Sequence, residues 1–304
     1  KRDPALHMFS IMAFRPRLVE GKSIKIHPLV TGGFNADFDG DTMAMYVPVS
    51  EKAVDEAKSM MPSKNLFSPT SNKLMVAPSM DSVLGIYQAT KWGKKKSGTY
   101  TDVQAIRDLK AGKLKSYDVI TVMGYKRPTT PGRLLINSTL PKEFKNRDDL
   151  LYDKNFRMAK GGMKDFATEI ARANPEEFSK MIDQWKNLGF NLSYKNGSSF
   201  SLNDFHDGKE ICDQVLKKYK SEEAKIRKGR GSQKSKDAKI VKLYQDAQKE
   251  LKTVGEARYN RRQDNRMWEW AQSGARGNWG QFSQMVMGPM IVQDPLNKPV
   301  AFPI

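Results

Sequence analysis

Three aspartates lie at alternate positions of one short segment, Asn35-Ala-Asp-Phe-Asp-Gly-Asp41. Side chains at i, i+2 and i+4 point to the same side of an extended backbone. Without a cation, three carboxylates so close together would repel one another and raise one another's pKa values. A hard divalent ion removes that repulsion, and carboxylate oxygens are its preferred ligands. The segment therefore predicts a metal site formed by Asp37, Asp39 and Asp41.

The residues between the aspartates fit this interpretation. Gly40 allows the backbone to turn so that Asp41 meets the other two carboxylates, and we expect Phe38 to anchor the loop by burying its ring. If the ion is Mg²⁺, it keeps several waters and is usually completed by substrate phosphates. Mg²⁺ lowers the pKa of an attacking hydroxyl and neutralises phosphoryl charge, so we expect nucleotidyl-transfer or nuclease chemistry.

Two other interpretations of the segment compete with this one. A calcium-binding EF-hand loop requires Gly at position 6 and Glu at position 12. Counted from Asp37, those positions are Thr42 and Pro48, so the EF-hand interpretation fails. A solvated aspartate-rich turn stays open at this point, because Asp and Gly both favour turns.

The overall charge indicates a polyanionic partner. Across 304 residues, 52 Lys and Arg face 34 Asp and Glu, for a net charge of +18. Such a surplus attracts nucleic acid, because each neutralised phosphate releases counterions. No apolar run is long enough to span a bilayer. The single cysteine, Cys212, excludes an internal disulfide and a cysteine-based zinc site, and it favours a reducing compartment.

The hydrophobic pattern predicts an α+β fold. Residues 1–50 are β-rich in pattern, and the apolar spacing after them is mostly helical. Expected strands are 11–19, 23–27, 42–47 and 134–136; expected helices are 51–61, 81–92 and two within 164–188, the second starting at Asn174-Pro175 and ending at Leu188-Gly189.

Residues 208–262 have a pattern of their own. Two amphipathic helical stretches flank the basic segment Lys225–Lys236, which contains Gly and Ser. This arrangement is typical of an antiparallel helical hairpin with a basic tip. Disorder at the tip itself is an equally good interpretation.

At this point the residues identify a family. The aspartate segment resembles the signature of the largest subunit, called β′ in bacteria, of multisubunit DNA-directed RNA polymerases. Further segments that resemble this family in chain order are Arg2-Asp-Pro-Ala-Leu-His7, Leu18-Val-Glu-Gly-Lys22, His27-Pro-Leu-Val30, Val47-Pro48, Ser68-Pro69, Pro78-Ser-Met-Asp-Ser-Val-Leu-Gly-Ile-Tyr87, Thr129-Thr-Pro-Gly-Arg133 and Ser273-Gly-Ala-Arg-Gly277.

The resemblance implies a fold and a site. Asp37, Asp39 and Asp41 would lie in a double-psi β-barrel and hold the catalytic Mg²⁺, while a second Mg²⁺ arrives with the NTP. Asn35 and Arg2 occupy positions that read the ribose hydroxyls, and Arg276 lies where the family places an arginine near the triphosphate. We expect His7 and His27 to lie in the core or to support neighbouring site residues rather than to act as catalysts.

The resemblance also implies a division into regions. They are 1–50, part of the double-psi β-barrel with the catalytic loop; 51–140, barrel-associated helices and short strands; 141–207, a helical pore- or funnel-like segment; 208–262, the helical hairpin, similar to the rim of the secondary channel; and 263–304, leading towards the bridge helix.

The partners implied are a β-type subunit, the remaining β′ parts, template DNA, nascent RNA and NTPs. The resemblance also implies subunits like α and ω, an initiation factor and cleavage factors as further partners. It implies no membrane partner. The expected location is the cytoplasm, at the nucleoid. The clamp, bridge helix and trigger loop of the family lie outside this sequence, so we expect either a split subunit or a segment of a longer one.

Some positions depart from typical bacterial chains. Thr42 stands where many have Gln, and the hairpin tip is richer in lysine. This divergence suits a phage-type polymerase, with a virion or infected cell as its location. Two other functions compete: a non-catalytic nucleic-acid-binding or assembly module that keeps the motif, and an RNA-templated polymerase with a related barrel. The many ordered matches outside the loop disfavour the second.

Overall fold

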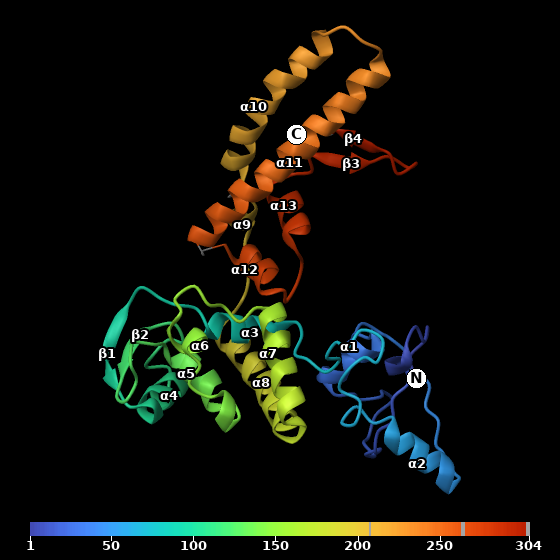
Figure 1. The fold of residues 1–304 in the computed structure, drawn as a ribbon, viewed down its shortest axis with the longest axis vertical. Coiled ribbons are helices and arrows are strands. Elements are labelled where there is room, and N and C mark those ends of the chain that lie inside the picture. The colour runs from blue at the N-terminus through green and yellow to red at the C-terminus, as the bar shows by residue number, and fades with distance from the viewer. Residues whose placement is uncertain (207, 263–264, 302–304) are drawn as a thin grey trace. The chain divides into compact units, whose positions relative to one another are not determined.

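In a computed structural model, residues 1–206, 208–262 and 265–301 are described. The chain divides into two compact units, Lys1–Gly197 and Ser198–Ile304, which are considered separately (Figure 1). Both combine helices with a few short strands, which agrees with the α+β class predicted from the pattern. Within the described ranges, no helix is both long enough and apolar enough to cross a bilayer.

The first unit contains helices α1 to α8 and one pair of strands. Its elements are η1 (Met8–Ser10), η2 (Pro28–Val30), α1 (Thr31–Phe34), α2 (Glu51–Ser59), α3 (Asp81–Ala89), β1 (Lys96–Tyr100), α4 (Asp102–Lys110), β2 (Val119–Val122), α5 (Pro131–Ser138), η3 (Lys142–Phe144), α6 (Asp148–Tyr152), α7 (Lys160–Ala173) and α8 (Pro175–Asn196). Strands β1 and β2 pair in parallel, with α4 as the crossover between them.

The second unit is built mainly from two long helices. Its elements are α9 (Leu202–His206), α10 (Lys209–Lys228), α11 (Gln233–Arg262), α12 (Arg266–Ser273), α13 (Trp279–Met287), β3 (Ile291–Gln293) and β4 (Pro299–Ala301). Helices α10 and α11 run side by side in Figure 1 and share a core with α12 and α13. Strands β3 and β4 form an antiparallel pair.

The strands expected within residues 1–50 are wrong for this structure. The only regular elements in this stretch, all of which the structure describes, are η1, η2 and the one-turn helix α1, so it forms no double-psi barrel. A β-strand is stabilised by its ladder partner and by packing of its apolar face. Along 42–49 the only backbone pairing among the described residues is that of Ala44 with Lys1, and the apolar side chains are not packed, since the exposed fractions of Met45, Tyr46, Val47 and Val49 are 77% to 90%.

The helix that starts at Pro175 extends beyond its predicted end. The pattern predicts a stop at Gly189, but α8 continues to Asn196. Gly189 has a packing function instead, because it lies against α3. A Cβ built on Gly85 of α3 would collide with the carbonyl oxygen of Gly189, and one on Gly189 would collide with that of Ser82. The backbones of α3 and α8 therefore touch directly.

The strand expected at 134–136 is wrong as well, because these residues lie within helix α5. Thr130 precedes α5 in an extended conformation, and Pro131 occupies the first helical turn, where proline fits best. Leu134 and Ile136 are fully buried. Because α5 is short and is buried on several sides, its apolar residues follow one another without the spacing typical of a helix. The run therefore resembled a strand in the sequence.

Arg133 is the polar centre of the first unit. Its side chain is completely buried, lies over the Trp92 ring at 4.9 Å, and makes its hydrogen bonds to backbone carbonyls. Nε and Nη2 donate to the Thr90 oxygen at 3.0 and 2.9 Å, Nη1 to Asp153 at 2.7 Å, and Nη2 to Phe156 at 2.9 Å. Burial, helped by the charge of Arg157, lowers the pKa of Arg133 to about 10. The guanidinium thus stays charged at neutral pH and joins the end of α3 to the 153–156 loop.

The contact of α3 with α8 generates a first prediction. Gly85→Ala should lower the free energy of unfolding by about 3 kcal/mol, because the added methyl forces the two backbones apart. Urea denaturation of the full chain measures this. Gly162→Ala is the matched control, since a Cβ there meets no atom within 4 Å, and it should stabilise α7 by about 0.5 kcal/mol. Equal effects of the two variants would contradict the close contact.

A second prediction concerns Arg133. Arg133→Lys should destabilise the chain by about 3 kcal/mol, because an ammonium group cannot reach three carbonyls with the planar geometry of a guanidinium. Urea denaturation again provides the measurement. The control is Arg107→Lys, whose parent side chain is 72% exposed and whose effect should stay within about 0.5 kcal/mol. A neutral Arg133→Lys would show that the carbonyl contacts do not stabilise the fold.

Candidate metal centre

The aspartate segment begins where α1 ends. Thr31, Gly33 and Phe34 of this helix are buried, and the Phe34 ring lies 6.1 Å from that of Phe14. Asn35 follows with φ 50° and ψ 44°, in the left-handed conformation. Asn tolerates this conformation better than most residues, so it can end the helix and redirect the chain. The Ala36 amide then donates to the Thr31 carbonyl at 3.0 Å, which fixes the start of the loop.

The three aspartates converge. One carboxylate oxygen from each of Asp37, Asp39 and Asp41 lies within 4.8 Å of the other two. Gly40 makes this possible with φ +119°, a backbone conformation that other residues rarely adopt. The Asp37 amide also donates to Asp41 Oδ2 at 3.3 Å, which closes the loop. The predicted meeting of Asp41 with the other two is therefore present.

The N-terminal residues hold the far end of the loop. The Lys1 amino group donates to the Ala44 carbonyl at 2.9 Å, and the Ala44 amide returns a bond of 2.9 Å to the Lys1 carbonyl. This pairing places Arg2 beside the carboxylates, where its Nε donates to Asp41 Oδ2 at 3.0 Å. The exposed fractions of the Arg2 and Asp41 side chains are only 19% and 24%. Sequence reasoning placed Arg2 near the site but missed this ion pair.

The electrostatics of the cluster follow from its crowding. Asp37 hydrogen-bonds to Asp39 and repels its charge, and together with Asp41 it raises the pKa of Asp39. Oxygens on opposite sides of an octahedral Mg²⁺ are about 4.2 Å apart, twice the usual bond length. The oxygens of the cluster all lie within 4.8 Å of one another, an upper limit slightly above this span, and the donor set is all carboxylate. Asp37, Asp39 and Asp41 therefore fit a hard divalent cation.

Other expectations have mixed outcomes. Phe38 does not anchor the loop, because 69% of it is exposed; with polar neighbours on both sides, the ring has no apolar surface to cover it. Asn35 and Arg2 both belong to the first unit and flank the triad in the chain or by contact. Arg276 is exposed and lies just beyond α12, in the second unit, so its role at a triphosphate stays a prediction.

His7 and His27 are both exposed, so neither is a core histidine, and each contacts the backbone of a short helix. The Nδ1 atom of His7 accepts from the Phe9 amide at 3.2 Å, and that of His27 accepts from the Leu29 amide at 3.3 Å. Each ring therefore caps a short 3-10 helix, η1 or η2. Neither ring contributes to the aspartate cluster.

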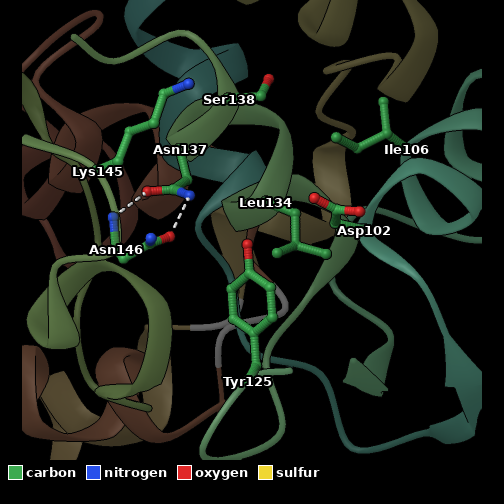
Figure 2. A pocket seen from close by; sticks show the side chains of 8 residues that line it. All are labelled: Asp102, Ile106, Tyr125, Leu134, Asn137, Ser138, Lys145 and Asn146. Carbon is green, nitrogen blue, oxygen red and sulfur yellow. Dashed lines mark hydrogen bonds between the residues drawn. The ribbon is translucent and has the colours of Figure 1, made fainter. Parts of the chain in front are cut away.

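A cavity of about 210 Å³ lies elsewhere in the first unit (Figure 2). Figure 2 shows the Tyr125 hydroxyl pointing into it, and Asn137 and Asn146 joined at its edge by two hydrogen bonds of 3.0 and 2.7 Å. Burial raises the pKa of Tyr125. None of the predicted site residues lines this cavity, so it is separate from the candidate metal centre.

Comparison with protein families gives two matches. A family model described as RNA polymerase Rpb1, domain 2, matches residues 1–63, which include the aspartate loop. A second, described as RNA polymerase Rpb1, domain 3, matches residues 65–205. The two matches follow one another along the chain and together cover about two thirds of it.

Curated relatives give the same result. The chain is 31% identical to DNA-directed RNA polymerase subunit beta' of Thermosipho melanesiensis over 319 aligned positions that include all of this chain. It is 31% identical to the subunit of the same name from Kocuria rhizophila, again over the whole chain, and 34% identical to that from Campylobacter jejuni over 93% of it. The chain spans 19% to 25% of the length of these relatives.

Proposed function

The chain belongs to the family of the largest RNA polymerase subunits, Rpb1 and β′, and from this premise we propose that it holds the active-site Mg²⁺ of a DNA-directed RNA polymerase. The proposal is carried by the convergence of three carboxylate oxygens within 4.8 Å, in the segment that matches domain 2 of the family. A solvated aspartate turn has no need to bring like charges together, because they repel.

The triad's own chemistry is to hold and to position. Asp37, Asp39 and Asp41 would bind the ion through one oxygen each, and their charge offsets that of the cation. When bound, Mg²⁺ supplies Lewis-acid activation of the RNA 3′-hydroxyl and neutralises charge on the NTP phosphates. Gly40 and the left-handed Asn35 keep the carboxylates on one side of the loop. The Arg2 contact holds Asp41 in its orientation.

Substrate recognition is proposed for the residues around the triad. The Asn35 amide and the Arg2 guanidinium both offer donors to a ribose hydroxyl, and the 2′-hydroxyl distinguishes RNA precursors from DNA precursors. Arg276 offers a planar set of donors that suits a triphosphate. The RNA would grow by one nucleotide with release of pyrophosphate.

Other parts of the polymerase must complete the site. The exposed apolar side chains of residues 42–49 support the proposal that this segment becomes a strand of a double-psi barrel once further strands are present. A β-type subunit, template DNA and the remaining β′ parts are the partners proposed. The relatives are named as DNA-directed enzymes, which favours a DNA template over an RNA template. We expect no RNA synthesis from this chain alone.

RNA synthesis by the assembled polymerase tests the function. Asp39→Asn should lower the rate by about a thousandfold or more, because it removes a metal-binding charge while keeping the side-chain shape. Primer extension with a DNA template measures the rate, and gel filtration checks that assembly is unchanged. Asp55→Asn, an exposed aspartate of α2 paired with Lys58, is the matched control and should retain full activity. Retained synthesis in Asp39→Asn would refute the proposal.

Metal localisation separates a live site from a non-catalytic module that merely keeps the motif. With Fe²⁺ in place of Mg²⁺, hydroxyl radicals should cleave the assembled polymerase and its RNA close to residues 37–41, because the radicals react near the ion that forms them. Mapping of the fragments shows where cleavage occurs. Asp39→Asn should abolish this cleavage and Asp55→Asn should leave it intact. Absence of localised cleavage in the unchanged protein would favour the module.

A further inference from the structure

The turn between α10 and α11 carries a cluster of positive charges outside the candidate metal centre. We define the hairpin tip as residues 225–239, which contain seven Lys or Arg and one Asp, Asp237. Six of the seven basic residues are exposed and the seventh, Lys236, is partly exposed. Figure 1 shows this turn at the end of the helical pair that lies farthest from α12.

Two of these cations are used within the hairpin. Arg227 Nη2 lies 2.6 Å from Glu223 Oε1, and Lys236 Nζ donates to the Arg227 carbonyl at 2.8 Å. The single acid, Asp237, accepts from Gln233 at 2.8 Å. The other five cations have no acidic partner among the described residues; they are Lys225, Lys228, Arg230, Lys234 and Lys239.

The stem below the tip is held firmly. The Tyr244 hydroxyl donates to Glu223 at 2.6 Å, and the Tyr219 hydroxyl donates to Glu250 at 2.7 Å. Burial and the Glu250 contact raise the pKa of Tyr219 to about 12, so this donor keeps its proton at neutral pH. Further along, Arg258 pairs with Glu210 at 3.2 Å. Helix α10 alone is about 30 Å long, so the tip is presented on a rigid support.

The lysines in the first turn of α11 do not stabilise that helix. The first turn of α11 has no acidic residue and contains Lys234 and Lys236. Cations near a helix N-terminus are unfavourable, because the backbone amides there already carry partial positive charge. Charge repulsion within the tip adds to this effect. An anion bound at the tip would reduce both the unfavourable interaction of the lysines with the helix N-terminus and the repulsion among the cations. This agrees with a surface whose function is to bind an anion.

We propose that the hairpin tip binds the phosphate backbone of nucleic acid, without regard to base sequence. The five unpaired cations supply the charge, and Ser232, Gln233 and Ser235 supply small polar groups for phosphate oxygens. A protein partner with an acidic face is the alternative. Protein interfaces are usually centred on exposed aromatic or large apolar side chains. The tip has none, since its only large apolar residue, Ile226, packs against the core of the second unit.

This surface is independent of the metal centre. No residue of the tip lies near the aspartate loop in the sequence, and the proposal does not require a bound metal. It also goes beyond the proposed catalytic function, which needs phosphate contacts at the triad but none on the hairpin. Failure of one proposal would therefore leave the other intact.

Binding of labelled nucleic acid by the full chain tests the proposal. The probe is a mixed-sequence DNA of about 30 nucleotides, single-stranded or duplex, followed by fluorescence anisotropy at several salt concentrations. Replacing Lys225, Lys228, Arg230, Lys234 and Lys239 by Gln should weaken binding at least about tenfold near 0.1 M salt. The slope of log affinity against log salt should fall by about 0.9 for each lost contact on duplex DNA.

Matched variants make the result specific. The control replaces five exposed lysines of the first unit by Gln, namely Lys52, Lys94, Lys95, Lys110 and Lys113, with the same loss of charge. It should change affinity by less than about threefold. A variant with Arg in place of Lys225, Lys228, Lys234 and Lys239 should keep the affinity. Circular dichroism checks that helix content is unchanged.

Two outcomes would overturn the proposal. Equal weakening by the tip variant and the control would show that the general field of the protein attracts nucleic acid. Unchanged DNA binding by the tip variant, together with lost binding of a polyglutamate peptide, would assign the tip to an acidic protein partner.

Discussion

Mutual repulsion among Asp37, Asp39 and Asp41 is the constraint around which the first fifty residues are organised. Like charges separate unless the backbone prevents it. Here it is prevented at both ends: the left-handed Asn35 fixes the start of the loop, and the paired Lys1 and Ala44 backbones fix its end. Arg2 places a positive charge against Asp41. The cluster is thus prepared for a cation by backbone geometry, and it does not depend on a buried environment.

The remainder of the first unit meets different constraints. Its body depends on backbone-to-backbone contact of α3 with α8 and on one buried guanidinium, that of Arg133. Both depend on short distances. An added methyl group would disrupt the contact of α3 with α8, and a lysine in place of Arg133 would lose the hydrogen bonds to the carbonyls. The Thr129–Arg133 segment, which resembles a family motif, therefore has a structural role here. A motif can be kept for the fold as well as for the reaction.

The amino-acid pattern allowed the site to be predicted better than the fold around it. Three aspartates at alternate positions, with the turn at Gly40 between the last two, define their chemistry locally, so their convergence follows from neighbouring residues alone. The α5 helix and the extension of α8 past Gly189 depended on burial and on contacts between distant residues, which a local pattern does not contain. Likewise, Phe38 was expected to be buried because rings usually are, but nothing in the described residues covers it.

The acidic cluster at residues 37–41 and the basic hairpin tip lie far apart along the chain. This separation suits the proposed handling of nucleic acid and phosphoryl transfer. A polymer of phosphates is attracted by the general surplus of +18, yet phosphoryl chemistry needs a negative cluster where the cation is held. With the proposed metal bound, concentrating the carboxylates in a seven-residue loop would confine their repulsion of a phosphate substrate to the point where the cation offsets it. The five cations of the hairpin tip that have no acidic partner among the described residues would serve attraction alone. Distributing the two functions between separate units lets each surface keep the charge that its chemistry requires.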